Sequence, residues 1–258
     1  MPGMGSLQPS PGAAPAGRMV WSQARFELRL LLRNGEQVLL TLVIPLVLLV
    51  VLSNVGVVDL GAPGTGRRVD VVTPGILALA VISTAFTAQA IALGFDRRSG
   101  VLRLLATTPL PRWALVGGRT LAVLAIECLQ VAVIVVVALL LGWHPQGSPV
   151  AVVGLLVAGT AAFSAWGIAL AGLLRAEATL AVANAVYLVF LLGGATVIPL
   201  ASLPAGLANV VRWLPSAALG DGLREVLVFG NPATAQIGLL LLWAAGGALL
   251  AARTFRWD

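Results

Sequence analysis

The feature of this sequence that most constrains its fold is a series of six long apolar runs. A helix needs about 20 apolar residues to cross the roughly 30 Å hydrocarbon core of a bilayer. Lipid offers the backbone no hydrogen-bond partners, so runs of this length predict membrane-spanning helices. The sequence therefore predicts an all-α membrane protein in which residues 18–258 form a single transmembrane domain with six spans. The predicted spans are residues 38–58, 74–95, 115–141, 150–174, 179–198 and 235–252.

The basic residues exclude one class of activity. All sixteen are Arg, because the chain contains no Lys. A phosphate-binding loop of the form GxxxxGK[ST] is therefore impossible, and we expect the chain not to hydrolyse nucleotides. With one His and one Cys, a His/Cys metal cluster is excluded as well. We expect no catalytic residues, no metal site and no cofactor in this chain, although a site built only from carboxylates stays formally open.

The first 36 residues predict two different segments. Residues 1–17 are rich in Pro, Gly and Ala and carry no charge, which predicts a disordered tail and lacks the basic and apolar regions of a signal peptide. Residues 18–36 predict an amphipathic helix lying in the membrane interface. Its apolar face comprises Val20, Trp21, Ala24, Leu28, Leu31 and Leu32, and its polar face comprises Arg25, Arg29, Arg33 and Glu36. A solvated helix packed on another subunit is the alternative.

The distribution of Arg residues predicts how the chain is oriented. With the N-terminus in the cytoplasm, only Arg67, Arg68, Arg212 and Arg224 fall on the opposite side of the membrane. The positive-inside rule therefore places both termini in the cytoplasm, in a multi-pass protein of the cell inner or plasma membrane. Because the Arg residues lie at the ends of apolar runs, topology explains the high net charge, and we expect no nucleic-acid partner.

The segment from residue 199 to residue 234 precedes the last predicted span. Pro199, Pro204 and Pro215 divide it into pieces too short to cross a bilayer. We expect short broken helices on the extracytoplasmic face, either interfacial or re-entrant. A plain structured loop is the alternative.

The stretch FDRRSGVLRLLATTPLPRWALVGGR, residues 95–119, contains five of the sixteen Arg residues between two predicted spans. Its pattern predicts a short helix, Val101–Ala106, capped by Asp96 or Ser99, with Leu102 and Leu105 on one face. Pro109 and Pro111 end this helix, and a second helix begins near Arg112. Apolar Leu side chains on one face of a helix beneath a bilayer need a surface to pack against. Either anionic head groups or a groove on a cytosolic protein could supply it.

The order D-R-R-S-G-V-L-R-L-L-A-T-T-P-L-P-R-W closely resembles the cytoplasmic coupling segment of type 2 ATP-binding-cassette exporter permeases, especially the daunorubicin-resistance-like group. The second Thr of T-T-P-L, and Asp96 where Glu is common, depart from the family pattern and leave the register open. The resemblance implies that residues 96–114 dock on a separate cytosolic ATPase subunit, which binds ATP and Mg²⁺. The implied docking residues are Asp96, Arg97, Gly100, Leu102, Leu105, Pro109 and Arg112.

The resemblance also implies a homodimer or heterodimer of permeases that encloses a substrate path. We expect efflux of a hydrophobic or amphipathic compound, such as a drug, an antibiotic or a lipid, with antibiotic resistance as a consequence. Export of a polysaccharide or a lipid-linked envelope component is the alternative. A membrane-embedded enzyme would need catalytic polar residues gathered at one depth, and the acids of this sequence are scattered.

Glu127 is the only acid well inside a predicted span, and buried intramembrane carboxylates are often functional. It is a candidate for the substrate path, or for the proton site of a secondary transporter. The structural alternative is a Glu bonded to Gln130, to a hydroxyl on another span or to the dimer partner.

Overall fold

The computed structural model describes residues 14–33, 35–55, 67–108 and 110–254, and every regular element within them is a helix. The first predicted segment, residues 1–17, lies almost entirely outside the described residues. The helices are α1 (Ala16–Arg33), α2 (Gly35–Asn54), α3 (Arg68–Val81), the π-helical η1 (Ile82–Ala88), α4 (Gln89–Arg98), α5 (Val101–Ala106), α6 (Arg112–Leu140), α7 (Pro149–Leu173), α8 (Ala176–Gly193), the 3-10 turn η2 (Leu200–Ser202), α9 (Ala205–Val211), α10 (Pro215–Leu227) and α11 (Thr234–Thr254).

Five helices in the described residues are long and apolar enough to cross a membrane, and they coincide with five of the six predicted spans. The first predicted span falls on α2. α2 spans Gly35–Asn54, but its side chains are described continuously only from Thr41 onward, so the count of six stays a prediction. The span predicted to end at Ile198 ends instead at Gly193. The five spans are Arg68–Arg98, Trp113–Leu140, Pro149–Leu173, Ala176–Gly193 and Thr234–Thr254.

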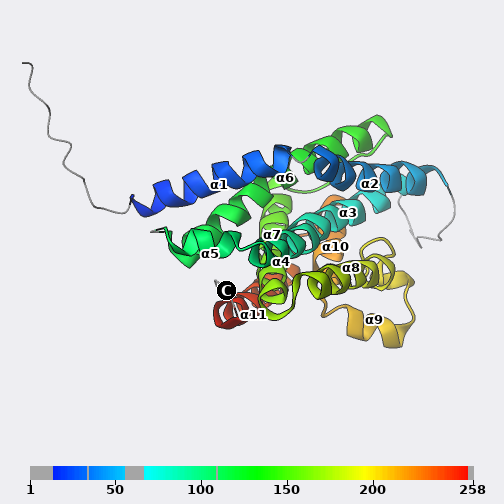
Figure 1. The fold of residues 1–258 in the computed structure, drawn as a ribbon. Helices are drawn as coiled ribbons and strands as arrows, with labels where there is room; N and C mark the ends of the chain where they lie inside the picture. Colours follow the sequence, from blue (N-terminus) through cyan, green and yellow to red (C-terminus); the bar gives the residue numbers. More distant parts are fainter. Residues whose placement is uncertain (1–13, 34, 56–66, 109, 255–258) are drawn as a thin grey trace, which may run out of the picture.

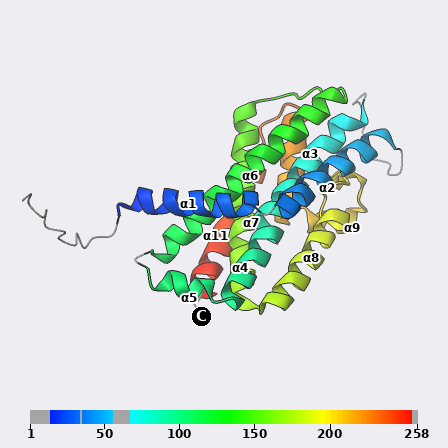
Figure 2. The same cartoon turned by 45° about the horizontal axis from the view of Figure 1, so that its top comes forward.

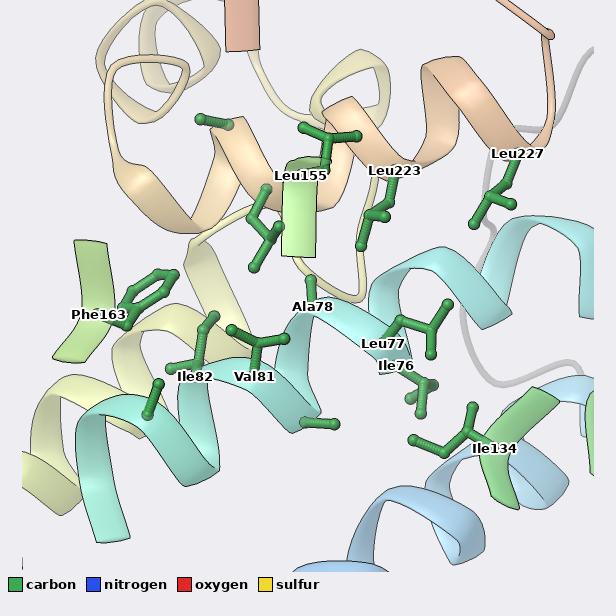
Figure 3. Close-up of a cluster of buried hydrophobic side chains, with 14 of the residues drawn as sticks. Ile76, Leu77, Ala78, Val81, Ile82, Ile134, Leu155, Phe163, Leu223 and Leu227 are labelled. Atoms are coloured by element: carbon green, nitrogen blue, oxygen red, sulfur yellow. The ribbon is translucent and has the colours of Figure 1, made fainter. Parts of the chain in front are cut away.

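A continuous helical segment formed by α3, η1 and α4 runs through the centre of the bundle (Figure 1). Almost every side chain of α3 is buried, because α2, α6, α7 and α10 pack around it. Figure 3 shows Ile76, Leu77 and Val81 of this segment facing side chains from other helices, including Leu155 of α7 and Leu223 of α10. This core holds the remaining helices in register with one another.

The π-helical turn η1 is joined to two neighbouring helices by a chain of hydrogen bonds. The Thr84 hydroxyl donates to the Gln130 side chain of α6 over 2.7 Å. The Gln130 amide in turn donates to the Thr41 carbonyl of α2 over 2.8 Å. Buried polar groups are costly without partners, so this chain ties α2, η1 and α6 together inside the bundle.

The segment before the last span contains short helices, as predicted. α9 is largely exposed, whereas nearly all of α10 is buried against α3, α7 and α11. Arg224 of α10 donates to the carbonyls of Ala195 and Thr196 and to the Asp221 carboxylate. The chain after α8 is thereby fixed onto α10. Whether α10 enters the membrane stays a prediction.

One end of the bundle gathers α5, the N-terminal part of α6 and the C-terminal end of α11, whereas α9 lies toward the other end (Figure 2). α1 extends from the bundle on the side of α5 and packs along α6. The predicted Arg-rich segment, residues 95–119, therefore lies at a single end of the molecule.

Candidate functional site

The Arg-rich segment has the helix–break–helix arrangement that the sequence predicts. α4 ends at Arg98, α5 spans Val101–Ala106, and α6 begins at Arg112 after Pro111. The predicted cap is wrong, because Gly100 occupies the N-cap position and no side chain caps α5. Gly100 has a φ of 77°, a left-handed conformation that glycine adopts without steric cost. This residue therefore sets the sharp change of direction between α4 and α5.

Leu102 lies inside the protein and not on an exposed docking face, which corrects the prediction from the helical pattern. Its side chain is 1% exposed in a small core with Leu115 of α6 and Ile168 of α7. Leu105 packs partly against the same core. The Leu face of α5 is thus covered by the protein's own spans. The helix is a fixed part of the bundle end.

The opposite face of α5 is the one that faces outward. Leu104 is 70% exposed, and Val101 and Arg103 are exposed beside it. The hydroxyls of Thr107 and Thr108 donate to the carbonyls of Leu104 and Leu105, which completes the last turn of the short helix. We call this surface, formed by Val101, Arg103, Leu104, Thr107 and Thr108, the outer face of α5.

Two Arg residues at the end of α4 fasten this helix to neighbouring spans. Arg97 donates to the carbonyls of Ala171 and Gly172 at the C-terminus of α7, over 2.9 and 3.0 Å. Cations are favoured at that position, since a helix ends in unpaired carbonyl groups. Arg98 forms an exposed ion pair with Glu177 at the start of α8. The predicted docking residue Arg97 therefore has a structural contact within the chain.

Three charged side chains from three helices meet behind α5 in a cluster that we call the Arg119 cluster. Arg119 of α6 donates to Glu27 of α1 over 2.9 Å and also to Asp96 of α4. Gln23 of α1 donates to the same Glu27 carboxylate over 2.8 Å. The side chains of Arg119 and Glu27 are 8% and 10% exposed. The predicted docking residue Asp96 thus binds within the protein.

The close contact of α1 with α6 brings Glu27 to Arg119. At Gly118 an added Cβ would lie 2.6 Å from Gln23, so only glycine lets α1 approach this closely. Val20 and Ala24 pack on α6 as well, while Trp21 and Leu32 of the predicted apolar face are exposed. The placement of α1 in the membrane interface stays a prediction.

A small cavity of about 50 Å³ adjoins the Arg119 cluster. Glu27 and Arg119 line it together with Gln89 of α4, which is 5% exposed and whose amide has no hydrogen-bond partner among the described residues. A space of this size, lined by several polar groups, fits one or two buried waters.

Sequence reasoning missed Glu27 and Gln23. A signal for both is present, because Gln23 and Glu27 stand one turn apart on the side of α1 that carries Ala24. An acid on the packed side of an amphipathic helix requires a cation opposite it. Gln89 is a single polar residue inside a predicted span, for which a bond to a neighbouring helix is expected, but its amide forms no such bond among the described residues.

Two predicted docking residues cannot be placed. Pro109 lies outside the described residues. Arg112 begins α6, but its side chain is likewise outside the described part.

Glu127 is buried between α6 and α7, where the Thr160 hydroxyl donates to one oxygen of its carboxylate. Its other oxygen has no partner among the described residues. Of the structural alternatives, a bond to a hydroxyl on another span is confirmed. Gln130 instead bonds to Thr84 and Thr41. A role in transport stays a prediction.

Five apolar helices of spanning length, with a short anchored helix at one end, define a multi-pass helical membrane protein. Residues 64–253 match the ABC-2 family transporter protein family, and the chain therefore belongs to that family as a membrane permease of an ABC transporter. It is 22% identical over 229 residues to "Putative transport permease YvfS" of Bacillus subtilis (strain 168). That match covers 86% of this chain and 90% of the relative.

Proposed function

We propose that this chain is the membrane-spanning subunit of an ATP-driven exporter and that a separate cytosolic ATPase subunit docks on the outer face of α5. The chain carries hydrophobic or amphipathic cargo outward, and ATP is hydrolysed only in the partner. Two permease chains, identical or different, enclose the cargo path.

The anchoring of α5 is the observation that carries this proposal. A partner can exert force on a helix only if that helix resists being displaced alone. Leu102 is buried among α4, α6, α7 and α11 side chains, and Arg97 holds the preceding helix to α7. Because Leu104 is exposed on the other face, α5 combines a free contact surface with a fixed back.

The chain also needs an external source of free energy. Moving a two-state transporter from about 1:99 to 99:1 takes roughly 5.5 kcal/mol of differential stabilisation. The sequence has no Lys and hence no phosphate-binding loop. An ATPase that presses on α5 would supply this difference from outside.

An aromatic cavity supports hydrophobic cargo. Phe163 and Trp166 of α7, Phe190 of α8 and Trp243 of α11 line a space of about 240 Å³ inside the spanning region. Phe163 and Phe190 meet edge to face with ring centroids 6.0 Å apart. A site of this composition favours flat apolar groups over sugars or inorganic ions. Export of polysaccharide or a lipid-linked envelope component remains the alternative. Such an exporter would also need an ATPase subunit and would differ only in its cargo.

The proposal is tested by co-purification of the full chain with its ABC ATPase in detergent. Leu104→Glu places a charge on the outer face of α5 and is expected to abolish binding without harming the fold. Leu140→Glu is the matched control, because Leu140 is 82% exposed and ends α6 far from α5 in the chain. We expect this control to bind as well as the wild type.

Equal binding by both variants would refute docking on α5. Loss of binding in both would show that any added charge disrupts the complex, and the assignment of α5 would again fail. Leu102→Arg is unsuitable as a test, because it would place a charge in the core and damage the fold.

A further inference from the structure

A large crevice lies between α6, α7 and α11, on the same half of the bundle as α5. Its volume is about 530 Å³, within the roughly 300–1,000 Å³ typical of small-molecule sites. Its walls are formed largely by small side chains, among them Ala161 and Ala165 of α7 and Ala248 and Ala251 of α11. No charged residue lines it among the described side chains.

The crevice opens beside surfaces that suit lipid. Leu121 of α6 and Leu249 of α11 stand next to lining residues in the sequence and are strongly exposed. α7 packs along α11 over its length and only sparsely against α6. The gap over α7 is therefore flanked by two apolar helix surfaces of the kind that contact acyl chains.

Three polar side chains line the crevice, and one of them is buried without a hydrogen-bond partner among the described residues. Ser164 is 2% exposed, and its hydroxyl has no hydrogen bond. It does not bond to the carbonyl four residues earlier, a bond that Ser and Thr hydroxyls often form within a helix. Thr120 and Trp113 lie along the α6 wall, where Thr120 is partly buried and Trp113 is exposed. A buried hydroxyl without a partner is uncommon, so Ser164 marks the crevice as a space that another group can enter.

A positive charge stands at the end of the crevice. Arg253 follows the lining residues Ala251 and Ala252 in the last turn of α11, is exposed, and forms no ion pair within the described part of the chain. Trp113, at the opposite wall, has the amphipathic character of a residue at a membrane interface. The apolar walls of the crevice therefore end at a cation on the α5 side, as the acyl chain of a phospholipid ends at a charged head group.

We propose that this crevice binds one acyl chain of an anionic phospholipid from the leaflet on the α5 side of the membrane. The chain lies against the Ala-rich walls. The phosphate lies at Arg253, and the acyl chain extends from there into the crevice past Ser164 and Thr120. The site differs from the aromatic cavity, which is lined by other residues.

The crevice is physically connected to α5. Val116, Ile168 and Ala251 line it and also belong to the small core that holds Leu102 and Leu115. A bound acyl chain would fill space behind these side chains and reduce the freedom of the core under α5. The consequence for energy coupling rests on the proposed function, whereas lipid binding does not.

The test uses the full chain reconstituted without any ATPase into phosphatidylcholine vesicles, with or without phosphatidylglycerol. A trace of phosphatidylglycerol carrying a photoreactive acyl chain is cross-linked, and the labelled residues are mapped by mass spectrometry. We expect labels concentrated on the crevice walls of α6, α7 and α11. Unlabelled phosphatidylglycerol should compete for these positions better than phosphatidylcholine does.

Matched variants separate a site from general contact with lipid. Ala248→Trp fills the crevice from an exposed position, whereas Leu249→Trp adds the same side chain one residue further on, outside it. We expect the first variant to lose the crevice labels and the second to keep them. Thr120→Trp fills the same crevice from α6 and serves as an independent check. If both variants lose the crevice labels, a folding defect in one of them does not explain the loss. Arg253→Gln should remove the preference for phosphatidylglycerol.

Labels spread evenly over all exposed apolar residues, or equal labelling of the two α11 variants, would overturn the proposal. So would equal competition by the two unlabelled lipids, because the anionic head group would then play no part. Displacement of the lipid by an exported compound would also overturn the proposal, because the crevice would then be a cargo site. None of these outcomes bears on ATPase docking, which the Leu104 variant tests separately.

Discussion

Replacing Arg119 by Ala should be among the most damaging single changes in this chain. The substitution leaves the carboxylates of Glu27 and Asp96 close together without their shared cation. These side chains are 10% and 24% exposed, so solvent compensates the loss only in part. Breaking a buried ion pair by removing one partner costs about 3–5 kcal/mol. We expect a loss of that size in the free energy of unfolding.

Arg98→Ala is the matched comparison. Arg98 also pairs with a carboxylate of another helix, but the two side chains are 61% and 63% exposed. An exposed pair contributes about 0–1 kcal/mol, because water and ions screen it. The assay is thermal or denaturant unfolding of both variants in the same detergent, followed by Trp fluorescence.

A double-mutant cycle then tests the mechanism. If Glu27 and Arg119 interact as described, the combined effect of Glu27→Gln and Arg119→Met should be clearly smaller than the sum of the single effects. Similar losses for Arg119→Ala and Arg98→Ala, or additive effects in the cycle, would refute the claim that the cluster is a buried, cooperative contact.

Three further predictions concern single positions in α5, α6 and α11 and at the turn before α5. Gly100→Ala should destabilise the chain by about 1–2 kcal/mol. The loss comes from the left-handed φ of 77° alone, since no neighbouring atom would obstruct the added Cβ. The control is Gly238→Ala, at an unobstructed site inside α11, which should be neutral or stabilise by up to about 1 kcal/mol in the same unfolding assay. Leu102→Ala should cost about 2–5 kcal/mol because it empties a core position, whereas Leu104→Ala should change stability by less than about 0.5 kcal/mol. Glu127→Gln keeps an acceptor for the Thr160 hydroxyl, so ATP-driven export in vesicles should persist. If the variant instead loses export, and export by the wild type depends on a proton gradient, the two results together would support proton coupling.

The spans were predictable because lipid imposes one requirement on both length and polarity. Their ends were less so, as the fifth predicted span shows. Apolar residues continue to Ile198, yet the helix ends at Gly193, and Ala195 adopts a φ of 55°. Arg224 binds the carbonyls of Ala195 and Thr196 from α10. The apolar character of a segment therefore predicts that it can enter the membrane, but it does not show whether a distant guanidinium binds its backbone and ends the helix.

The same distinction explains the outcome for the candidate site. The breaks at Gly100 and Pro111 are local chemistry, and the position of α5 was therefore predictable. The face that α5 exposes was not, because Leu102 is buried in a core to which Ile168 and Ala251, remote in sequence, also contribute. The Arg119 cluster likewise joins Glu27 to a residue 92 positions away. Periodicity identifies the two faces of a helix, but only the packing of the chain decides which of them is buried.

The contacts that hold α5 also determine which helices would move if an ATPase subunit pushed on its outer face. A helix of six residues joined to its neighbours only by Gly100 and the Pro-rich link would bend at those joints. Here Leu102 is buried in a core shared with α4, α6 and α7, and Arg97 and Arg119 tie the adjoining α4 to α7, α6 and α1. Detaching α5 would empty the Leu102 position at a cost of about 2–5 kcal/mol, while the buried ion pairs resist displacement of α4, to which Gly100 joins α5. The apolar contact alone is of the same order as the roughly 5.5 kcal/mol that reverses a two-state equilibrium. Force on α5 would therefore displace α1, α4 and the ends of the spans as one body before α5 detached.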